Sequence, residues 1–273
     1  MADLRICLTI AGSDSGGGAG IQADIKTMQA NGVFAASVIT AITAQNTRTV
    51  ARAFELPIDL IEAQIDAVLD DMTVASTKTG MLSSAAIIHA VAAKASEGGL
   101  GKLVVDPVMI SKSGFKLLRD DAVGALREEL LPLADVVTPN AHEAGLLCGF
   151  EIENETDARR AAEAIHAMGP AAVLVKGGHL SEEEAAVDVL FDGSEFHAFR
   201  EDRIDTPHTH GTGCTYAAAI AANLAKGYDL HLAVARSKLY VTKAIRAGLA
   251  IGAGHGPVDH FYYLRNAPDF PFG

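Results

Sequence analysis

The residues best suited to chemistry form the segment His210-Gly-Thr-Gly-Cys-Thr215, which leads into an Ala-rich stretch from Tyr216 to Ala225. Glycines let the backbone approach a ligand closely. The first N–H groups of a helix lack internal partners and carry the positive end of its dipole, so they bind anions. A helix N-terminus also favours the thiolate form of a cysteine. Gly211, Thr212, Gly213 and Cys214 are therefore candidates for chemistry on a phosphate.

The elements that must position this segment follow from the hydrophobic pattern. Apolar runs that read as strands alternate with amphipathic runs that read as helices, and no linker or repeat divides the chain. Strands filled with apolar residues indicate a mostly parallel sheet covered by helices on both faces. We therefore expect one α/β domain over residues 1–273, built as a three-layer α/β/α sandwich. The expected strands cover residues 4–11, 34–44, 73–80, 102–105, 135–138, 172–176, 187–191 and 195–199, and the expected helices cover 20–30, 58–72, 84–95, 119–131, 154–168, 215–226 and 231–250.

Polar motifs follow the expected strands at the points where the strands end. In open parallel sheets ligands gather at these carboxyl ends. The motifs are Gly12-Ser-Asp14, Gln45-Asn46, Lys78-Thr-Gly80, Asp106-Pro107, Asn140 and Lys176-Gly177. Their convergence on one sheet edge predicts a single ligand site.

Three of these strand ends carry charge that suits a phosphorylated ligand. Asp106 and Glu143 offer the oxygen ligands that Mg²⁺ prefers, although Glu143 is also placed as a first-turn helix acid. Lys176 is suited to neutralise a phosphate, and the alternative is a surface lysine. Gln45 can present a donor and an acceptor to a heteroaromatic edge, but from the residue alone a solvated glutamine is the favoured interpretation.

The segment Gly12-Ser-Asp-Ser-Gly-Gly-Gly-Ala-Gly20 is rich in glycine and follows the first expected strand. Residues 18–23 match a loose dinucleotide-binding fingerprint, but the acidic residue that would bind the ribose does not follow the second strand. The segment is not a P-loop either, because no Lys-Ser or Lys-Thr pair follows its glycines. Close approach of a ligand is the favoured interpretation over a flexible turn. Asp24 lies four residues beyond Gly20 and fits either a site-facing position or the solvated first turn of a helix.

Composition limits the partners. The formal net charge is −12, which argues against nucleic acid and anionic membranes as ligands. The three cysteines show no paired spacing and are expected to be free thiols in a reducing compartment. The N-terminal residues lack a signal-peptide pattern, so a cytoplasmic location is expected. The ten histidines form no zinc signature.

Seven motifs together resemble the hydroxymethylpyrimidine/phosphomethylpyrimidine kinases of thiamin biosynthesis, which belong to the ribokinase-like superfamily. The resemblance covers nearly the whole chain, and the order and spacing of the motifs make it specific. The motifs are TIAGSDSGGGAGIQAD (residues 9–24), AITAQNT (41–47), KTGML (78–82), VDPVM (105–109), TPN (138–140) with Glu143, VKGGH (175–179) and HGTGCT (210–215).

This resemblance implies a ribokinase-like fold, a homodimer, and use of ATP and Mg²⁺ to phosphorylate the pyrimidine alcohol and then its monophosphate. Gln45 matches the position that binds the pyrimidine, and the positions lining the same pocket are matched by Gly12, Asp24, Met81 and Val108. Asp106 and Glu143 match positions around Mg²⁺ and phosphate. The ATP contacts are matched by Lys176 and Thr212, with Asn140 expected beside them. Residues 211–214 match the anion hole, with Cys214 as the proposed base.

Three other functions stay open at this point. A pyridoxal kinase of the same branch would phosphorylate a similar hydroxymethyl group, but some pyridoxal-active relatives carry a second cysteine where this chain has Ile110. A dinucleotide-dependent oxidoreductase would use residues 18–23. A non-catalytic ligand sensor is disfavoured by the intact set of Asp106, Glu143, Lys176 and Cys214.

Overall fold

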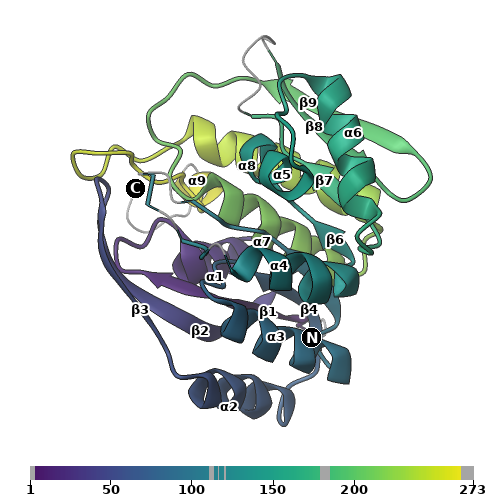
Figure 1. The fold of residues 1–273 in the computed structure, drawn as a ribbon. Helices are drawn as coiled ribbons and strands as arrows, with labels where there is room; N and C mark the ends of the chain where they lie inside the picture. Colours follow the sequence, from purple (N-terminus) through teal and green to yellow (C-terminus); the bar gives the residue numbers. More distant parts are fainter. Residues whose placement is uncertain (1–3, 111–113, 116, 120, 179–184, 266–273) are drawn as a thin grey trace.

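A computed structural model describes residues 4–110, 114–115, 117–119, 121–178 and 185–265 (Figure 1). Within this part of the chain the strands form one nine-stranded sheet in the order β3-β2-β1-β4-β5-β6-β7-β8-β9. The six strands from β2 to β7 run parallel, whereas β3, β8 and β9 are antiparallel to their neighbours. The bounds are β1 Ile6–Asp14, β2 Phe34–Gln45, β3 Val50–Glu55, β4 Val74–Thr79, β5 Lys102–Val105, β6 Val136–Val137, β7 Val173–Val175, β8 Ala185–Phe191 and β9 Phe196–Asp202.

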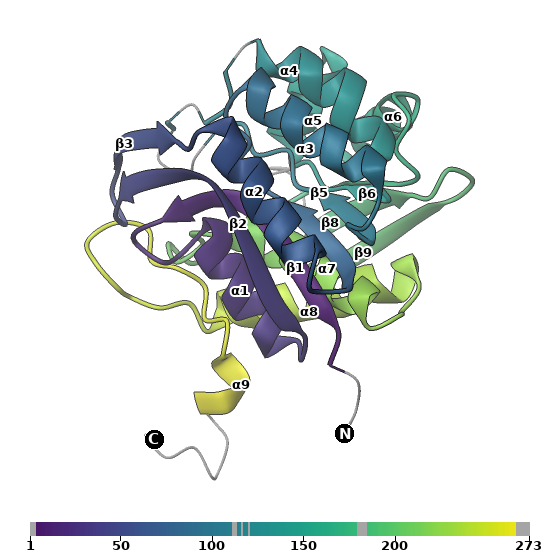
Figure 2. The same cartoon turned by 90° about the horizontal axis from the view of Figure 1, so that it is seen from below.

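Helices cover both faces of this sheet. Figure 2 shows α1, α7 and α8 on one side and α2 to α6 on the other. The bounds are α1 Gly20–Ala30, α2 Ile58–Leu69, α3 Ala85–Glu97, α4 Ala122–Ala125, α5 Ala141–Cys148, α6 Glu155–His166, α7 Thr212–Ala225, α8 Leu230–Arg246 and α9 Tyr262–Arg265. The expected three-layer α/β/α fold is therefore confirmed.

The central strands are apolar on both faces because each face packs against a helical layer. Leu8, Val105 and Val137 belong to the core cluster under α2 to α6. Their sequence neighbours Cys7, Val104 and Val136 belong to the cluster under α1, α7 and α8. Successive side chains of a strand point to opposite faces, so continuous apolar runs fill both cores.

Helix α7 lies in the middle of its layer, packed against α1, α8 and the strands β4 and β5. Residues Ala217 to Ala222 are fully buried. Small side chains on every face let neighbouring elements approach this helix from all sides. The Ala-rich sequence therefore lets α7 begin near the middle of the edge that is formed by the carboxyl ends of the parallel strands.

The strand order reverses at β1, since β2 lies on one side of it and β4 on the other. Such a switch point opens a crevice at the carboxyl ends of the strands, because the helices that follow leave toward opposite faces. The loops after β1 and β4 both border this crevice. The topology thus places the glycine-rich loop beside the start of α7.

Most expected elements are present, and the differences have physical causes. The antiparallel strand β3 was missed because only its first residue, Val50, is buried, so no apolar pattern marks it. The predicted helix over 119–131 is an irregular stretch that includes α4, a π-helical turn at Leu126–Leu130 and a 3₁₀ turn at Leu131–Leu133. The expected strands over 187–191 and 195–199 are confirmed as β8 and β9, which pair in antiparallel fashion. None of the helices in the described residues has the length and apolar character needed to cross a membrane.

Candidate active site

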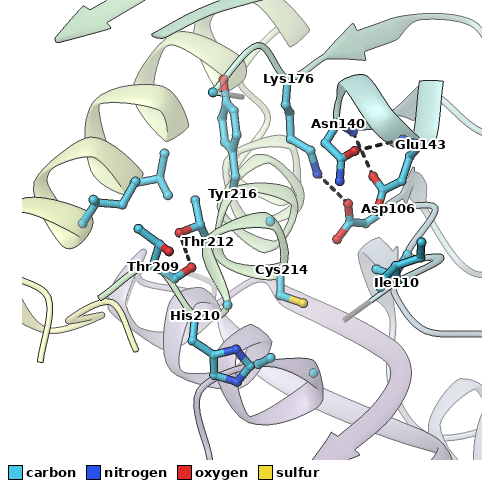
Figure 3. Close-up of a pocket in the computed structure, with 18 of the residues that line it drawn as sticks. Asp106, Ile110, Asn140, Glu143, Lys176, Thr209, His210, Thr212, Cys214 and Tyr216 are labelled. Atoms are coloured by element: carbon cyan, nitrogen blue, oxygen red, sulfur yellow. Dashed lines mark hydrogen bonds and ion pairs between the residues drawn. The ribbon is translucent and has the colours of Figure 1, made fainter. Parts of the chain in front are cut away.

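A cavity of about 760 Å³ opens at the carboxyl edge of the sheet and runs past the start of α7. Figure 3 shows Cys214 at its middle, with Lys176, Asp106, Asn140 and Glu143 to one side and His210 to the other. Nearly all the residues that the sequence singled out line this cavity. They are Gly12, Gln45, Met81, Asp106, Val108, Asn140, Glu143, Lys176, Gly211, Thr212, Gly213 and Cys214.

The start of α7 is shaped by a direct contact between the two glycine-rich segments. Gly211 caps the helix with a φ of 79°, and a Cβ added there would lie 1.8 Å from the carbonyl oxygen of Gly18. The N–H of Thr215 makes the first helical bond, to Gly211 O. The N–H groups of Gly213 and Cys214 precede this bond and lie in the turn that lacks intrahelical acceptors. Free N–H groups at a helix start are suited to binding an anion, and both residues line the cavity.

The thiol of Cys214 lies on this turn but is not set up as a thiolate. Desolvation raises its pKa to about 11, because burial outweighs the nearby positive charge of Lys78, and Asp24 and Asp106 add to the rise. The expectation that the helix N-terminus would favour a thiolate is therefore wrong for the free protein. Burial of the sulfur, which the sequence does not report, decides this pKa.

Lys176 and Asp106 form a charged pair at the cationic end of the cavity. The Lys176 Nζ lies 2.8 Å from Asp106 Oδ1, which also accepts a hydrogen bond from Thr138 Oγ1 at 3.3 Å. These residues follow β7, β5 and β6, so three neighbouring strand ends build the cluster. Burial would lower the pKa of Lys176, but the charges of Asp106 and Glu143 raise it, so the side chain is a permanent cation.

Asn140 and Glu143 also cap a helix. The Asn140 side chain accepts from Glu143 N at 2.9 Å, and Glu143 Oε2 accepts from Asn140 N at 2.8 Å. This reciprocal capping box starts α5, a helix that our sequence reading missed although the Asn-x-x-Glu spacing signals it. Desolvation raises the pKa of Glu143 to about 7, and Asp106 adds to the rise while Lys176 opposes it.

Met81, Val108 and Gln45 line the opposite end of the cavity. Met81 packs so tightly on Gly12 that a Cβ on Gly12 would lie 2.3 Å from the Met81 methyl carbon. Val108 follows β5, and the side chain of Gln45 lies at the end of β2 within contact of Thr43 and His210. Apolar side chains with one amide suit a small heteroaromatic ring.

Asp24 is not among the cavity-lining residues and occupies neither of its expected positions. It is fully buried behind the cavity wall, where its Oδ2 pairs with Lys78 Nζ at 2.9 Å and accepts from Thr9 Oγ1 at 2.6 Å. Lys78 is itself fully buried, and Asp24 raises its pKa against desolvation. The pair lies near Cys214, where Lys78 lowers the pKa of the thiol and Asp24 raises it.

The glycine-rich loop that follows β1 is folded against its own chain. The Gly18 position contacts the His210 ring, and Gly20, with a φ of 56°, faces the carbonyl oxygen of Gly12. Two glycines of the dinucleotide fingerprint are thus required for contacts within the protein. These contacts account for both glycines without a bound dinucleotide.

A third region of the cavity was missed in the sequence. It lies between the segment after β9 and helix α8, and its lining includes Arg203, Ile204, Thr206, Val241, Thr242 and Ile245. Asp188 also lines the cavity, and it accepts from Gly177 N at 3.0 Å and pairs with Lys238 at 2.8 Å. Helix α8 reads as an ordinary amphipathic helix, so no local signal marks these residues. His179, the last residue of the 175–179 motif, lies outside the described residues.

Comparison with known proteins gives consistent results. The family model described as phosphomethylpyrimidine kinase matches residues 14–259. A hydroxymethylpyrimidine/phosphomethylpyrimidine kinase from Streptomyces coelicolor is 53% identical over 259 residues, covering 95% of each chain.

Two solved structures share the fold. A phosphomethylpyrimidine kinase from Clostridium difficile 630 is 46% identical with a TM-score of 0.78, covering 88% of this chain and 99% of its own. The pyridoxal kinase of Staphylococcus aureus, in complex with AMP-PCP and pyridoxal, is 36% identical with a TM-score of 0.90, covering 97% of this chain and 96% of its own. With the seven motifs gathered around one cavity, the chain belongs to the phosphomethylpyrimidine kinase family and has its ribokinase-like fold.

Proposed function

We propose that the protein is an ATP-dependent kinase that phosphorylates 4-amino-5-hydroxymethyl-2-methylpyrimidine and then its monophosphate, in thiamin biosynthesis. One observation carries this proposal. The anion-binding start of α7 lies in the same cavity as the Lys176–Asp106 cluster and the Gln45–Met81 end. A nucleotide phosphate chain and a small ring can therefore meet at Cys214.

The α8 end of the cavity suits the nucleotide base. It is bounded by Ile204, Val241 and Ile245, and it continues past Lys176 toward Gly213. An added Cβ on Gly213 would lie 3.4 Å from Lys176 Nζ, so the lysine lies directly beside the turn. We therefore assign the contacts with the ATP phosphates to Lys176, Thr212 and Asn140.

The donor set near Lys176 fits Mg²⁺ that arrives with a nucleotide. Mg²⁺ takes one or two carboxylates and completes its shell with phosphate oxygens and water. Asp106 and Glu143 provide two carboxylates, and their mutual repulsion contributes to the raised pKa of Glu143. Among the described residues no group of three or more His, Cys, Asp or Glu side chains could hold a metal ion. Bound there, Mg²⁺ would neutralise phosphate charge.

In the reaction the γ-phosphoryl group moves in line to the substrate hydroxyl, and positioning with charge stabilisation supplies most of the rate. The N–H groups of Gly213 and Cys214 stabilise the developing charge as an oxyanion hole does. Cys214 is the residue we propose to take the hydroxyl proton. With its pKa near 11, it reaches the thiolate form rarely at neutral pH, so the anion hole carries more of the rate than the base.

Similarity to a pyridoxal kinase favours one second candidate, phosphorylation of pyridoxal. Ile110 stands at the cavity rim and is exposed there, and it offers no thiol to an aldehyde. Pyridoxal is also a small aromatic alcohol, so the relative rates decide between the two substrates. The homodimer and the cytoplasmic location remain predictions.

The test is a coupled assay with ATP and Mg²⁺ on three substrates: the pyrimidine alcohol, its monophosphate and pyridoxal. We expect product from both pyrimidines and a higher kcat/KM for the pyrimidine alcohol than for pyridoxal. Lys176→Met should lower kcat/KM roughly 100-fold, since it removes a charge aimed at the phosphates. Lys94→Met serves as the matched control, because Lys94 of α3 pairs with Asp66 and is not among the cavity-lining residues. A higher kcat/KM for pyridoxal, or no product from either alcohol, would overturn the proposal.

A further inference from the structure

The carboxylate of Asp14 holds the glycine-rich loop and links it to the segment that starts α7. Its Oδ1 accepts from Gly16 N at 2.8 Å, and its Oδ2 accepts from Gly18 N at 3.1 Å and Ala19 N at 2.9 Å. The Nε2 atom of His210 lies 2.9 Å from the same Oδ2. Asp14 is only 3% exposed, so these partners replace water around it.

Asp14 is ionised at neutral pH. Burial by itself would raise the pKa of this carboxyl, but the hydrogen bonds from His210 and the Gly16 backbone hold the pKa below its usual value. An ionised carboxylate only accepts hydrogen bonds, so the Nε2 atom of His210 must carry the proton that it shares with Asp14. That nitrogen then has no lone pair with which to accept another hydrogen bond.

This proton placement conflicts with the neighbouring Gln45 amide. Gln45 Nε2 lies 3.4 Å from His210 Nε2, so a donor faces a donor. A second conflict occurs on the other side of the amide. Thr43 Oγ1 lies 2.9 Å from Ser13 O and 3.1 Å from Gln45 Oε1, and its single proton cannot serve both acceptors.

Turning the Gln45 amide by half a revolution about its last bond removes both conflicts. The carbonyl oxygen then faces the N–H of His210, and the NH₂ group donates to Thr43 Oγ1, which donates its own proton to Ser13 O. Orientations of this kind are assigned from the hydrogen-bond network around the amide. We propose that the Asp14–His210 pair fixes Gln45 in this orientation, and that His210 is a positioning residue for recognition of the substrate ring.

The orientation of the Gln45 amide determines which of its hydrogen-bonding groups remain free to bind a ligand. Thr43 uses one N–H of the amide, and the amide oxygen faces the His210 N–H, whose hydrogen bond goes mainly to Asp14. One N–H donor and the oxygen acceptor therefore remain side by side for a ligand. A ring nitrogen next to an exocyclic amino group presents the complementary acceptor and donor. This step rests on the proposed function, since 4-aminopyrimidines carry that edge. A pyridine alcohol without a neighbouring amino group satisfies only one of the two.

The orientation itself is tested by NMR on the ligand-free protein, with labelled Gln and His side chains and Thr methyl groups. We expect the His210 ring proton on Nε2, and cross-relaxation from the Gln45 NH₂ protons to the Thr43 methyl group. Gln45→Glu identifies the amide signal. A ring proton on Nδ1 alone, or cross-relaxation from the Gln45 NH₂ protons to the His210 ring in place of Thr43, would overturn the proposal.

The functional arm compares two variants of His210. His210→Phe keeps a ring against Gly18 but removes the donor, and it should raise KM for the pyrimidine alcohol about tenfold while KM for ATP changes less than twofold. His210→Gln keeps an N–H within reach of Asp14 and should restore most of the loss. An unchanged KM for the pyrimidine alcohol in His210→Phe would refute the positioning role. The NMR result does not depend on the substrate, so failure of the proposed function would leave it standing.

Discussion

The contact between the two glycine-rich segments makes a sharp prediction for Gly211→Ala. Gly211 has a φ of 79°, a backbone conformation that costs an alanine about 1–2 kcal/mol. The added methyl group would also lie 1.8 Å from the carbonyl oxygen of Gly18, so the chain must move by more than an ångström. Overpacking of this kind costs about 1–3 kcal/mol. Together the two effects should lower the free energy of unfolding by roughly 2–5 kcal/mol.

Gly227 provides the matched control at the other end of the same helix. Its φ of 86° is equally unfavourable for alanine, but nothing lies within 4 Å of an added Cβ. Gly227→Ala should therefore show only the backbone cost, about 1–2 kcal/mol. The difference between the two variants measures the contact between the segments. Urea unfolding followed by circular dichroism gives both free energies.

Activity gives a second readout for the same pair. A displacement of about an ångström at the start of α7 should lower kcat/KM by about 100-fold in Gly211→Ala, because the anion hole shifts relative to the phosphate. Gly227→Ala should retain most of the parent activity. If the two variants unfold at the same urea concentration and turn over equally fast, the two segments do not press on each other as described.

Two further predictions concern Cys214 and His260. Cys214→Ala should slow the first phosphorylation more than the second, because only the alcohol acceptor of the first step must lose a proton. Single-turnover rates of the two steps measure this difference, and equal losses in both would exclude Cys214 as the base. Burial lowers the pKa of His260 to about 4, with Lys26 adding to the effect, so this neutral histidine stabilises the fold above pH 6.5 and loses that contribution as the pH falls toward 4. Between pH 7 and 4.5 the free energy of unfolding of the parent should drop by about 2–3 kcal/mol more than that of His260→Gln. If the free energies of unfolding of the two proteins fall in parallel with pH, the prediction for His260 is wrong.

Much of the fold could be predicted because its signals are local. Helix α1 and strand β5 begin and end at the expected residues, since Gly20, the Asn31-Gly32 stop and Asp106-Pro107 punctuate the chain. Where the local signal was weak or overlooked, elements were missed. Strand β3 buries only Val50 and shows no alternation, and α5 was missed although Asn140 and Glu143 form its capping box.

The sequence by itself determined which residues gather at the cavity, because parallel strands bring their carboxyl ends to one edge whatever their separation along the chain. Tertiary structure alone decided their environments. It buried Asp24 against Lys78, raised the pKa of the Cys214 thiol, and pressed Gly211 against Gly18. The reason is that residue type and spacing follow from local rules, whereas desolvation and proton sharing depend on every segment that packs around a group.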